Sequence, residues 1–230
     1  LGLPDEFPKT MHPDQSTIIA VIPISKDVEK SSIPYKLLSK LIKGMKSANF
    51  INDIFLVSSD EEITIDLNTK WVNRDLIKDS SNLGIEELLK FSLDFIESKS
   101  IFPDAILYAN YEYPFRPGNI FDEMIAKSQY GGFETIFMGL ERYNHYWHLD
   151  NLGNMVIVDK SLASNKKRDP IYEACYGLGC LTSSSIVRSG KLIGGSIGIM
   201  EIEDNPKFTL RYTKSEASNH LIENLLENKI

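Results

Sequence analysis

Short apolar runs alternate along the first 140 residues with segments whose apolar positions recur at helical spacing. The runs predict buried strands at 17–23, 54–57 and 105–109, and the alternating stretch 133–140 predicts a fourth. The helical spacing predicts amphipathic helices at 36–45, 85–96 and 119–128. This order favours a mainly parallel, mixed sheet covered on both faces, a three-layer α/β sandwich in which the first three strands are neighbours.

The pattern changes after residue 140, where a polar and aromatic stretch replaces the regular alternation. Turn residues at 151–154 predict a hairpin. Beyond residue 170 we expect a strand at 177–182, a short helix at 184–189, a strand at 197–202 and a closing helix at 215–227. We therefore expect an N-terminal arm (1–16) and one α/β domain (17–230) with an inserted arm at 141–170.

Composition narrows the possible functions. The chain has 230 residues and a net charge of -7, so it lacks the overall basic character of a nonspecific nucleic-acid binder. No apolar run approaches the roughly 18 residues of a membrane span, and the N-terminus does not read as a signal peptide. The spacing of Cys175 and Cys180 fits neither a redox pair nor a zinc site, which leaves two reduced thiols and a cytoplasmic location as the default.

The densest candidate chemistry follows the strand at 105–109. Asn110, Glu112 and Arg116 come directly after this apolar run. In open α/β sheets, ligands bind beyond the carboxyl ends of the strands, so we expect these side chains at the mouth of a site. The alternative is a strand leaving the core, with Arg116 in a surface ion pair.

Other clusters favour structural roles. The aromatic cluster at 145–148 can stack on a base or sugar, but a protein interface is favoured. Gly194 and Gly195 lack dinucleotide-loop spacing and are interpreted as turn glycines, and the acids at 60–62 as a helix-capping turn. Acids at 201–204 are interpreted as a solvated strand edge.

Several segments, taken in order, resemble the cytidylyltransferases that activate acidic sugars. They are IIAVIP, VSSDEEI, NRDLIKD, NYEYPFRPGNIFDEMI, HYWHLDNLGNM, KKRDPIYEACYGLGCLT and GKLIGGSIGIMEI. The chain is most similar to CMP-sialic acid synthetases and more distantly to 3-deoxy-manno-octulosonate cytidylyltransferases. The resemblance implies a nucleotide-diphospho-sugar transferase-like fold and a homodimer formed partly by the inserted arm. It also implies transfer of CMP from CTP to a sialic-acid-like nonulosonate, with Mg²⁺ as cofactor.

The resemblance also assigns roles to individual residues. Arg116, Glu112 and Lys26 are the catalytic candidates, and Glu112 is the candidate metal ligand. The candidates for binding the nucleotide or the sugar are Ser25, Lys30, Arg74, Asn110, Lys167, Arg168 and Tyr172.

Two departures from the family pattern weaken the expected activity. The loop SKDVEKSSIPYK is short, contains no glycine and adds two acids where the family wraps a triphosphate. Arg211 and Thr213 stand where the family has metal-binding carboxylates. We therefore keep three hypotheses: a divergent, weak cytidylyltransferase, a degenerate nucleotide- or sugar-binding protein, and a related enzyme with another substrate.

Overall fold

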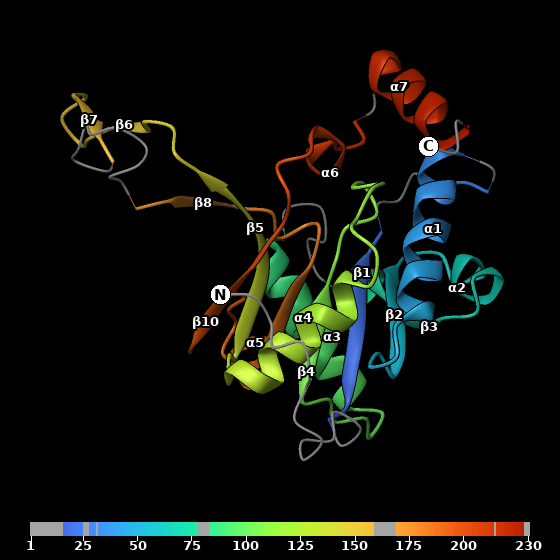
Figure 1. Ribbon diagram of the computed structural model, residues 1–230. Coiled ribbons are helices and arrows are strands. Elements are labelled where there is room, and N and C mark those ends of the chain that lie inside the picture. The colour runs from blue at the N-terminus through green and yellow to red at the C-terminus, as the bar shows by residue number, and fades with distance from the viewer. Residues whose placement is uncertain are drawn as a thin grey trace.

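The structure is a computed structural model that describes residues 16–24, 28–30, 32–77, 83–158, 169–213 and 215–227. Its centre is a mixed eight-stranded sheet in the order β10-β5-β9-β4-β1-β2-β3, with β8 paired to β5 (Figure 1). The sheet strands are β1 (Ile18–Pro23), β2 (Asp53–Ser58), β3 (Lys70–Asn73), β4 (Ala105–Tyr108), β5 (Thr135–Arg142), β8 (Ile171–Ala174), β9 (Cys180–Ser183) and β10 (Ile197–Glu201).

The predicted neighbours lie side by side. Strand β1 pairs in parallel with β2 on one side and with β4 on the other, and β2 pairs in parallel with β3. Strand β9 runs antiparallel between β4 and β5, which makes the sheet mixed. The carboxyl ends of β1, β2, β3 and β4 therefore meet at one edge, which we call the strand mouth.

Helices cover both faces of the sheet, as predicted. On one face, α1 (Ile33–Ser47) and α4 (Ile120–Gly131) share a buried cluster with the even-numbered side chains of β1. On the other face, α3 (Ile85–Glu97) and α5 (Ser184–Arg188) pack on the odd-numbered ones. The closing helix α7 (Glu216–Glu227) adds Ile222 to the first cluster.

The helix boundaries follow from local chemistry. Ser32 caps α1 by accepting a hydrogen bond from the Tyr35 amide, and Pro34 lies in the first turn, where no intrahelical donor is needed. Helix α4 ends at Gly132, whose φ of 65° is in the left-handed region that glycine adopts without strain. The acidic turn also behaves as interpreted, because the Asp60 carboxylate accepts from the Glu62 amide at the start of α2 (Glu62–Asp66).

Several short elements of mixed polarity were not predicted from the sequence. These are α2 as a full helical turn, β3, the 3-10 turn η2 (Arg74–Leu76), β8 and α6 (Pro206–Thr209). Each spans five residues or fewer, so hydrophobic periodicity has too few positions to reveal it. Within the described residues, no helix is long and apolar enough to cross a membrane.

The inserted segment projects from the body as an arm (Figure 1). The end of β5 pairs with β8 to form its base, and the hairpin of β6 (Trp147–Leu149) and β7 (Met155–Ile157) forms its tip. The Asp150 carboxylate accepts from the Leu152 and Asn154 amides at 2.8 Å, which fixes the tight turn. The predicted hairpin at 151–154 is thus confirmed.

Candidate functional site

The strand-mouth loop, residues 109–119, connects β4 to α4 and carries the residues singled out from the sequence. Its first turn is closed by Asn110, whose side-chain oxygen accepts from the Glu112 amide at 2.9 Å. The Asn110 amide in turn donates to the Gly177 carbonyl at 2.8 Å, in the loop that enters β9. A Cβ at Gly177 would lie 2.4 Å from the Tyr113 ring, so only glycine allows this close approach.

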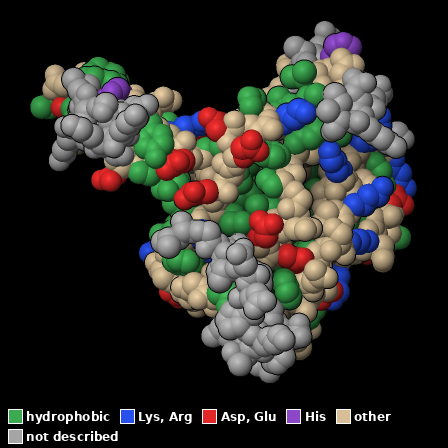
Figure 2. Space-filling view, viewed as in Figure 1, with side chains coloured by type: hydrophobic (Ala, Val, Ile, Leu, Met, Phe, Trp, Pro, Cys, Tyr) green, Lys and Arg blue, Asp and Glu red, His purple; other side chains and the backbone are tan. Residues whose placement is uncertain are grey.

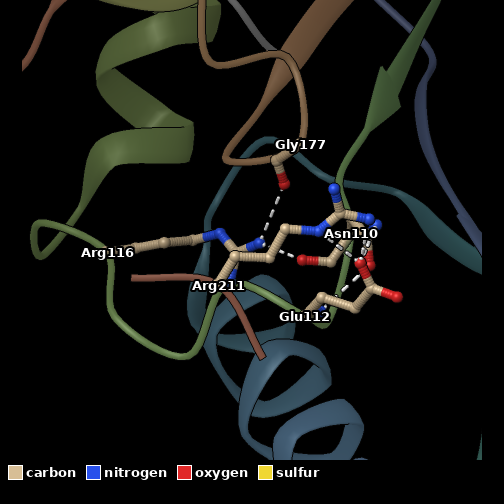
Figure 3. A network of polar contacts seen from close by, with 5 residues as sticks. All are labelled: Asn110, Glu112, Arg116, Gly177 and Arg211. Carbon is tan, nitrogen blue, oxygen red and sulfur yellow. Dashed lines mark hydrogen bonds and ion pairs between the residues drawn. The ribbon is translucent and has the colours of Figure 1, made fainter. Parts of the chain in front are cut away.

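Arg116 holds this loop together from inside (Figure 3). Its Nε donates to the Leu178 carbonyl at 2.8 Å, and its Nη2 donates to the carbonyls of Asn110 and Gly177 at 2.6 and 3.1 Å. Its Nη1 donates to the Tyr113 carbonyl. Burial lowers the pKa of the Arg116 guanidinium, although the two nearby tyrosines act in the opposite direction.

This geometry corrects the expectation that Arg116 is available to bind a ligand carboxylate or sits in a surface ion pair. Four of its donor contacts go to backbone carbonyls of its own and the neighbouring loop. The side chain thus positions the strand mouth. The pattern PFRP could not reveal this, because the accepting carbonyls at 177 and 178 are more than 60 residues away.

Glu112 points out of the loop and meets Arg211 (Figure 3). The Arg211 Nε lies 2.7 Å from Glu112 Oε2, and Arg211 Nη2 contacts the same oxygen. Asn110 Nδ2 donates to that oxygen at 3.2 Å, and the Tyr212 amide donates to the Glu112 carbonyl at 2.7 Å. The hydrogen bond that Arg211 donates to the Glu112 carboxylate raises the pKa of Arg211. The segment after α6 is therefore bound to the strand-mouth loop through both side chain and backbone.

A metal ion does not fit this arrangement. Divalent cations such as Mg²⁺ need anionic or neutral oxygen ligands, and here a guanidinium lies against the candidate carboxylate. Among the residues that the structure describes, no group of three His, Cys, Asp or Glu side chains lies close enough to hold a metal. The expectation that Glu112 is a metal ligand is therefore not supported, and the substitution at Arg211 noted in the sequence explains why.

The remaining candidates lie in different places. Arg74, at the end of β3, donates from Nη1 to the Ile24 carbonyl at 2.7 Å and so reaches the end of β1 at the strand mouth. Lys30 pairs instead with Asp66 of α2 at 2.7 Å.

Tyr172 lies on β8 at the base of the arm, where its hydroxyl donates to Glu201 of β10 at 3.0 Å. The acids Glu201, Glu203 and Asp204 are exposed, in agreement with a solvated strand edge, and Asp204 also pairs with Arg142 at 2.8 Å. Ser25, Lys26, Lys167 and Arg168 lie outside the described residues.

The structure thus brings together Asn110, Glu112, Arg116 and Arg211, with Arg74 at the same edge of the sheet. Tyr108, at the end of β4, joins this group, since burial and then the Glu112 charge raise its pKa to about 12. Neither Tyr108 nor the pairing of Arg211 with Glu112 was predicted from the sequence. The pairing joins residues 99 positions apart, and no local sequence pattern predicts a contact over that separation.

Solved structures of a synthetase and of two synthases share this fold. A CMP:2-keto-3-deoxy-manno-octonic acid synthetase complexed with CTP matches with a TM-score of 0.64 and 6% identity, over 94% of this chain and 100% of that one. The 4-diphosphocytidyl-2C-methyl-D-erythritol synthase of Anaerococcus prevotii matches with a TM-score of 0.62 and 11% identity, over 94% and 98%. A further 4-diphosphocytidyl-2C-methyl-D-erythritol synthase matches at 0.61 and 13%, over 92% and 100%.

These likenesses establish a cytidylyltransferase-like fold along nearly the whole chain. No family sequence profile matches the chain, and no curated protein sequence matches it. Identities of 6–13% show the fold alone, so the function has to be argued from the strand mouth.

Proposed function

We propose that this protein is a slow cytidylyltransferase that transfers CMP from CTP to an acidic sugar of the sialic-acid type. The observation that carries the proposal is the strand mouth itself. There, an amide, a carboxylate and two arginines, Arg74 and Arg211, gather on a fold also found in a synthetase complexed with CTP. Ligands of open α/β sheets bind at this edge.

The proposed reaction joins the two substrates at the α-phosphate. A sugar hydroxyl oxygen attacks the α-phosphorus, the bond to pyrophosphate breaks, and the hydroxyl proton passes to water. Ser25, Lys26, Lys30 and Arg74 are proposed to bind the nucleotide, since cations at the carboxyl ends of strands neutralise phosphate charge.

The acidic sugar is proposed to lie on the other side of the reacting phosphate. Asn110 would pair with a sugar hydroxyl, and Tyr172, Lys167 and Arg168 remain proposed contacts from the base of the arm. Arg116 is proposed to act by holding Asn110 and Glu112 in place, because its donors are taken by backbone carbonyls.

Slow turnover follows from the pairing of Glu112 with Arg211. The carboxylate that would hold a divalent cation is bound by a guanidinium, and we derive no step through a metal. Loss of one preorganised group that stabilises transition-state charge typically costs about a hundredfold or more in rate. The same pairing favours a second candidate function, a protein that binds nucleotide or sugar without turnover.

A homodimer through the arm is part of the proposal. The arm exposes large apolar side chains, visible as green atoms at its tip in Figure 2. They are Trp147, Leu149, Leu152, Met155 and Val158, with 47–86% of their surface exposed. Contiguous apolar surface on a projecting hairpin is typical of an interface. The buried free thiols Cys175 and Cys180 are in keeping with a reducing, cytoplasmic compartment.

The test is pyrophosphate release from CTP with N-acetylneuraminate, related nonulosonates and 3-deoxy-manno-octulosonate. We expect measurable release well below the ordinary enzymatic rate of about 10 per second. Asn110→Ala should reduce it, whereas Asn151→Ala, an exposed control on the arm turn, should leave it unchanged.

Two outcomes discriminate the alternatives. CTP or sugar binding without any pyrophosphate release would select the binding protein. Binding of neither compound would contradict both functions.

A further inference from the structure

A pocket lies between the C-terminal half of α1, the start of α4 and the second half of the strand-mouth loop. Its volume is about 290 Å³, near the lower end for pockets that hold small organic molecules. The walls are mixed. Apolar surface comes from Leu41, Ala48, Pro114, Pro117 and Phe121, and polar groups include Lys40 and Ser47. We call it the α1–α4 pocket.

The cations of this pocket lack carboxylate partners. Lys40 Nζ lies 4.5 Å from the centre of the Phe115 ring, and no carboxylate of the described residues pairs with it. Arg116 also lines the pocket, and its hydrogen-bond partners among the described residues are backbone carbonyls. Burial, followed by the nearby Arg116 charge, lowers the pKa of Lys40. Two positive charges thus lie at one pocket, Lys40 exposed at its rim and Arg116 half-buried, and an anion beside them would be attracted to both.

The carboxylate of Asp122, which also lines the pocket, accepts hydrogen bonds from Asn49 and Phe50. Asp122 accepts from the Asn49 amide at 2.9 Å and from the Asn49 side chain at 2.9 Å, and it also accepts from the Phe50 amide at 3.3 Å. These bonds tie its carboxylate to the turn between α1 and β2. Among the described residues Asp122 forms no ion pair with Lys40, but it keeps its negative charge, so an anion is expected at the Lys40 side of the pocket.

The surroundings reinforce the positive character. Helix α1 exposes Lys36 and Lys43 on the same side as Lys40, and Figure 2 shows Lys and Arg side chains gathered over α1. The first residues of α4 line the pocket as well, and the first amides of a helix have no intrahelical acceptor. In a chain of net charge -7 this is a local reversal of sign.

We propose that the α1–α4 pocket binds a small organic anion, with its phosphate or carboxylate group beside Lys40 and its apolar body against Leu41, Pro114 and Phe121. The apolar walls favour an organic molecule over an inorganic ion. The charge of Lys40, which has no carboxylate partner among the described residues, favours an anionic molecule over a neutral molecule. The site borders the strand-mouth loop, with which it shares Pro114 and Arg116, but the proposal does not depend on the proposed transfer reaction.

Gly44 provides a precise way to close the pocket. It lines the pocket within α1, and a Cβ added to it meets no atom within 4 Å. Gly44→Ala should therefore be accommodated in place, and Gly44→Leu, whose longer side chain extends from the same Cβ, is expected to obstruct the pocket, with Gly44→Ala as its matched control. Lys40→Gln removes the proposed anion contact, and Lys43→Gln removes an exposed charge one turn along the same helix.

The measurement is calorimetric titration of the full chain with phenyl phosphate, benzoate and the neutral benzyl alcohol. We expect one site for an anionic probe at about 1 mM affinity or tighter, and weaker binding of benzyl alcohol. Lys40→Gln should weaken anion binding by about tenfold and Gly44→Leu should abolish it, with both controls near wild type.

Three results would overturn the proposal. The first is absence of binding for both anionic probes. The second is equal affinity for benzyl alcohol, which would remove the role of charge. The third is unchanged anion binding in a folded Gly44→Leu variant, with the far-ultraviolet circular dichroism of the wild type, which would place the anion elsewhere on the protein.

Discussion

Removal of the Arg116 side chain should lower the free energy of unfolding strongly. The polar loop sequence around Arg116 suggests a smaller effect, because such loops are usually exposed. Arg116→Ala deletes the donors to the carbonyls of Asn110, Tyr113, Gly177 and Leu178. Two of these acceptors keep a backbone donor, because the Tyr113 amide reaches the Asn110 carbonyl and the Asn110 amide reaches the Gly177 carbonyl. The Tyr113 and Leu178 carbonyls lose the contact that Arg116 provides.

The expected magnitude follows from these two carbonyls. A buried polar group left without a partner costs about 1–3 kcal/mol, so two cost about 2–6 kcal/mol. Removing a cation from a desolvated position offsets part of this. We therefore expect Arg116→Ala to lower the free energy of unfolding by about 3 kcal/mol, equivalent to a fall in Tm of roughly 6–12 °C for a domain of this size.

Urea denaturation followed by circular dichroism measures the effect. Arg116→Met, which keeps an apolar stem but no donors, should lose a similar amount. The control is Arg188→Ala, which removes a surface ion pair with Glu97 and should cost less than about 1 kcal/mol. A loss below about 1 kcal/mol for both Arg116 variants would refute the assignment of Arg116 as the residue that holds the strand mouth.

Three further results are expected. Arg211→Asp places a second carboxylate beside Glu112, so Mn²⁺ titrated alone, followed by electron paramagnetic resonance, should bind this variant more tightly than the wild type. Burial raises the pKa of Cys180 to about 12 and also raises that of Cys175, so both thiols should react slowly with a disulfide reagent at pH 8 and quickly after unfolding. Leu152→Asp at the arm tip should shift the molar mass measured by light scattering from dimer to monomer.

Much of the fold follows from hydrophobic periodicity. Strands β1, β2 and β4 are apolar runs bounded by turn residues, and α1 and α3 show the spacing of one buried face, so their type and neighbours were predictable. Strand β8 was not, because two of its four residues are exposed and it is stabilised by pairing with β5. Its place depends on a partner about 30 residues away.

The candidate site was only partly predictable, because its chemistry depends on contacts between distant segments. The position of Asn110 and Glu112 after β4 could be inferred from the strand rule alone. The roles of Arg116 and Arg211 could not. The sequence alone does not distinguish an arginine that faces a ligand from one that donates to buried carbonyls. The two roles are distinguished only by the contacts that residues 177–178 and 211 make with the strand-mouth loop.

The most direct test is calorimetric titration of CTP into the wild-type protein, once with Mg²⁺ and once with EDTA. We expect one saturable site whose affinity for CTP differs by less than about threefold between the two conditions, because Arg211 rather than a metal ion neutralises Glu112. Absence of CTP binding in both titrations would contradict a nucleotide site at the strand mouth. Binding that appears only with Mg²⁺ would contradict the replacement of the metal by Arg211.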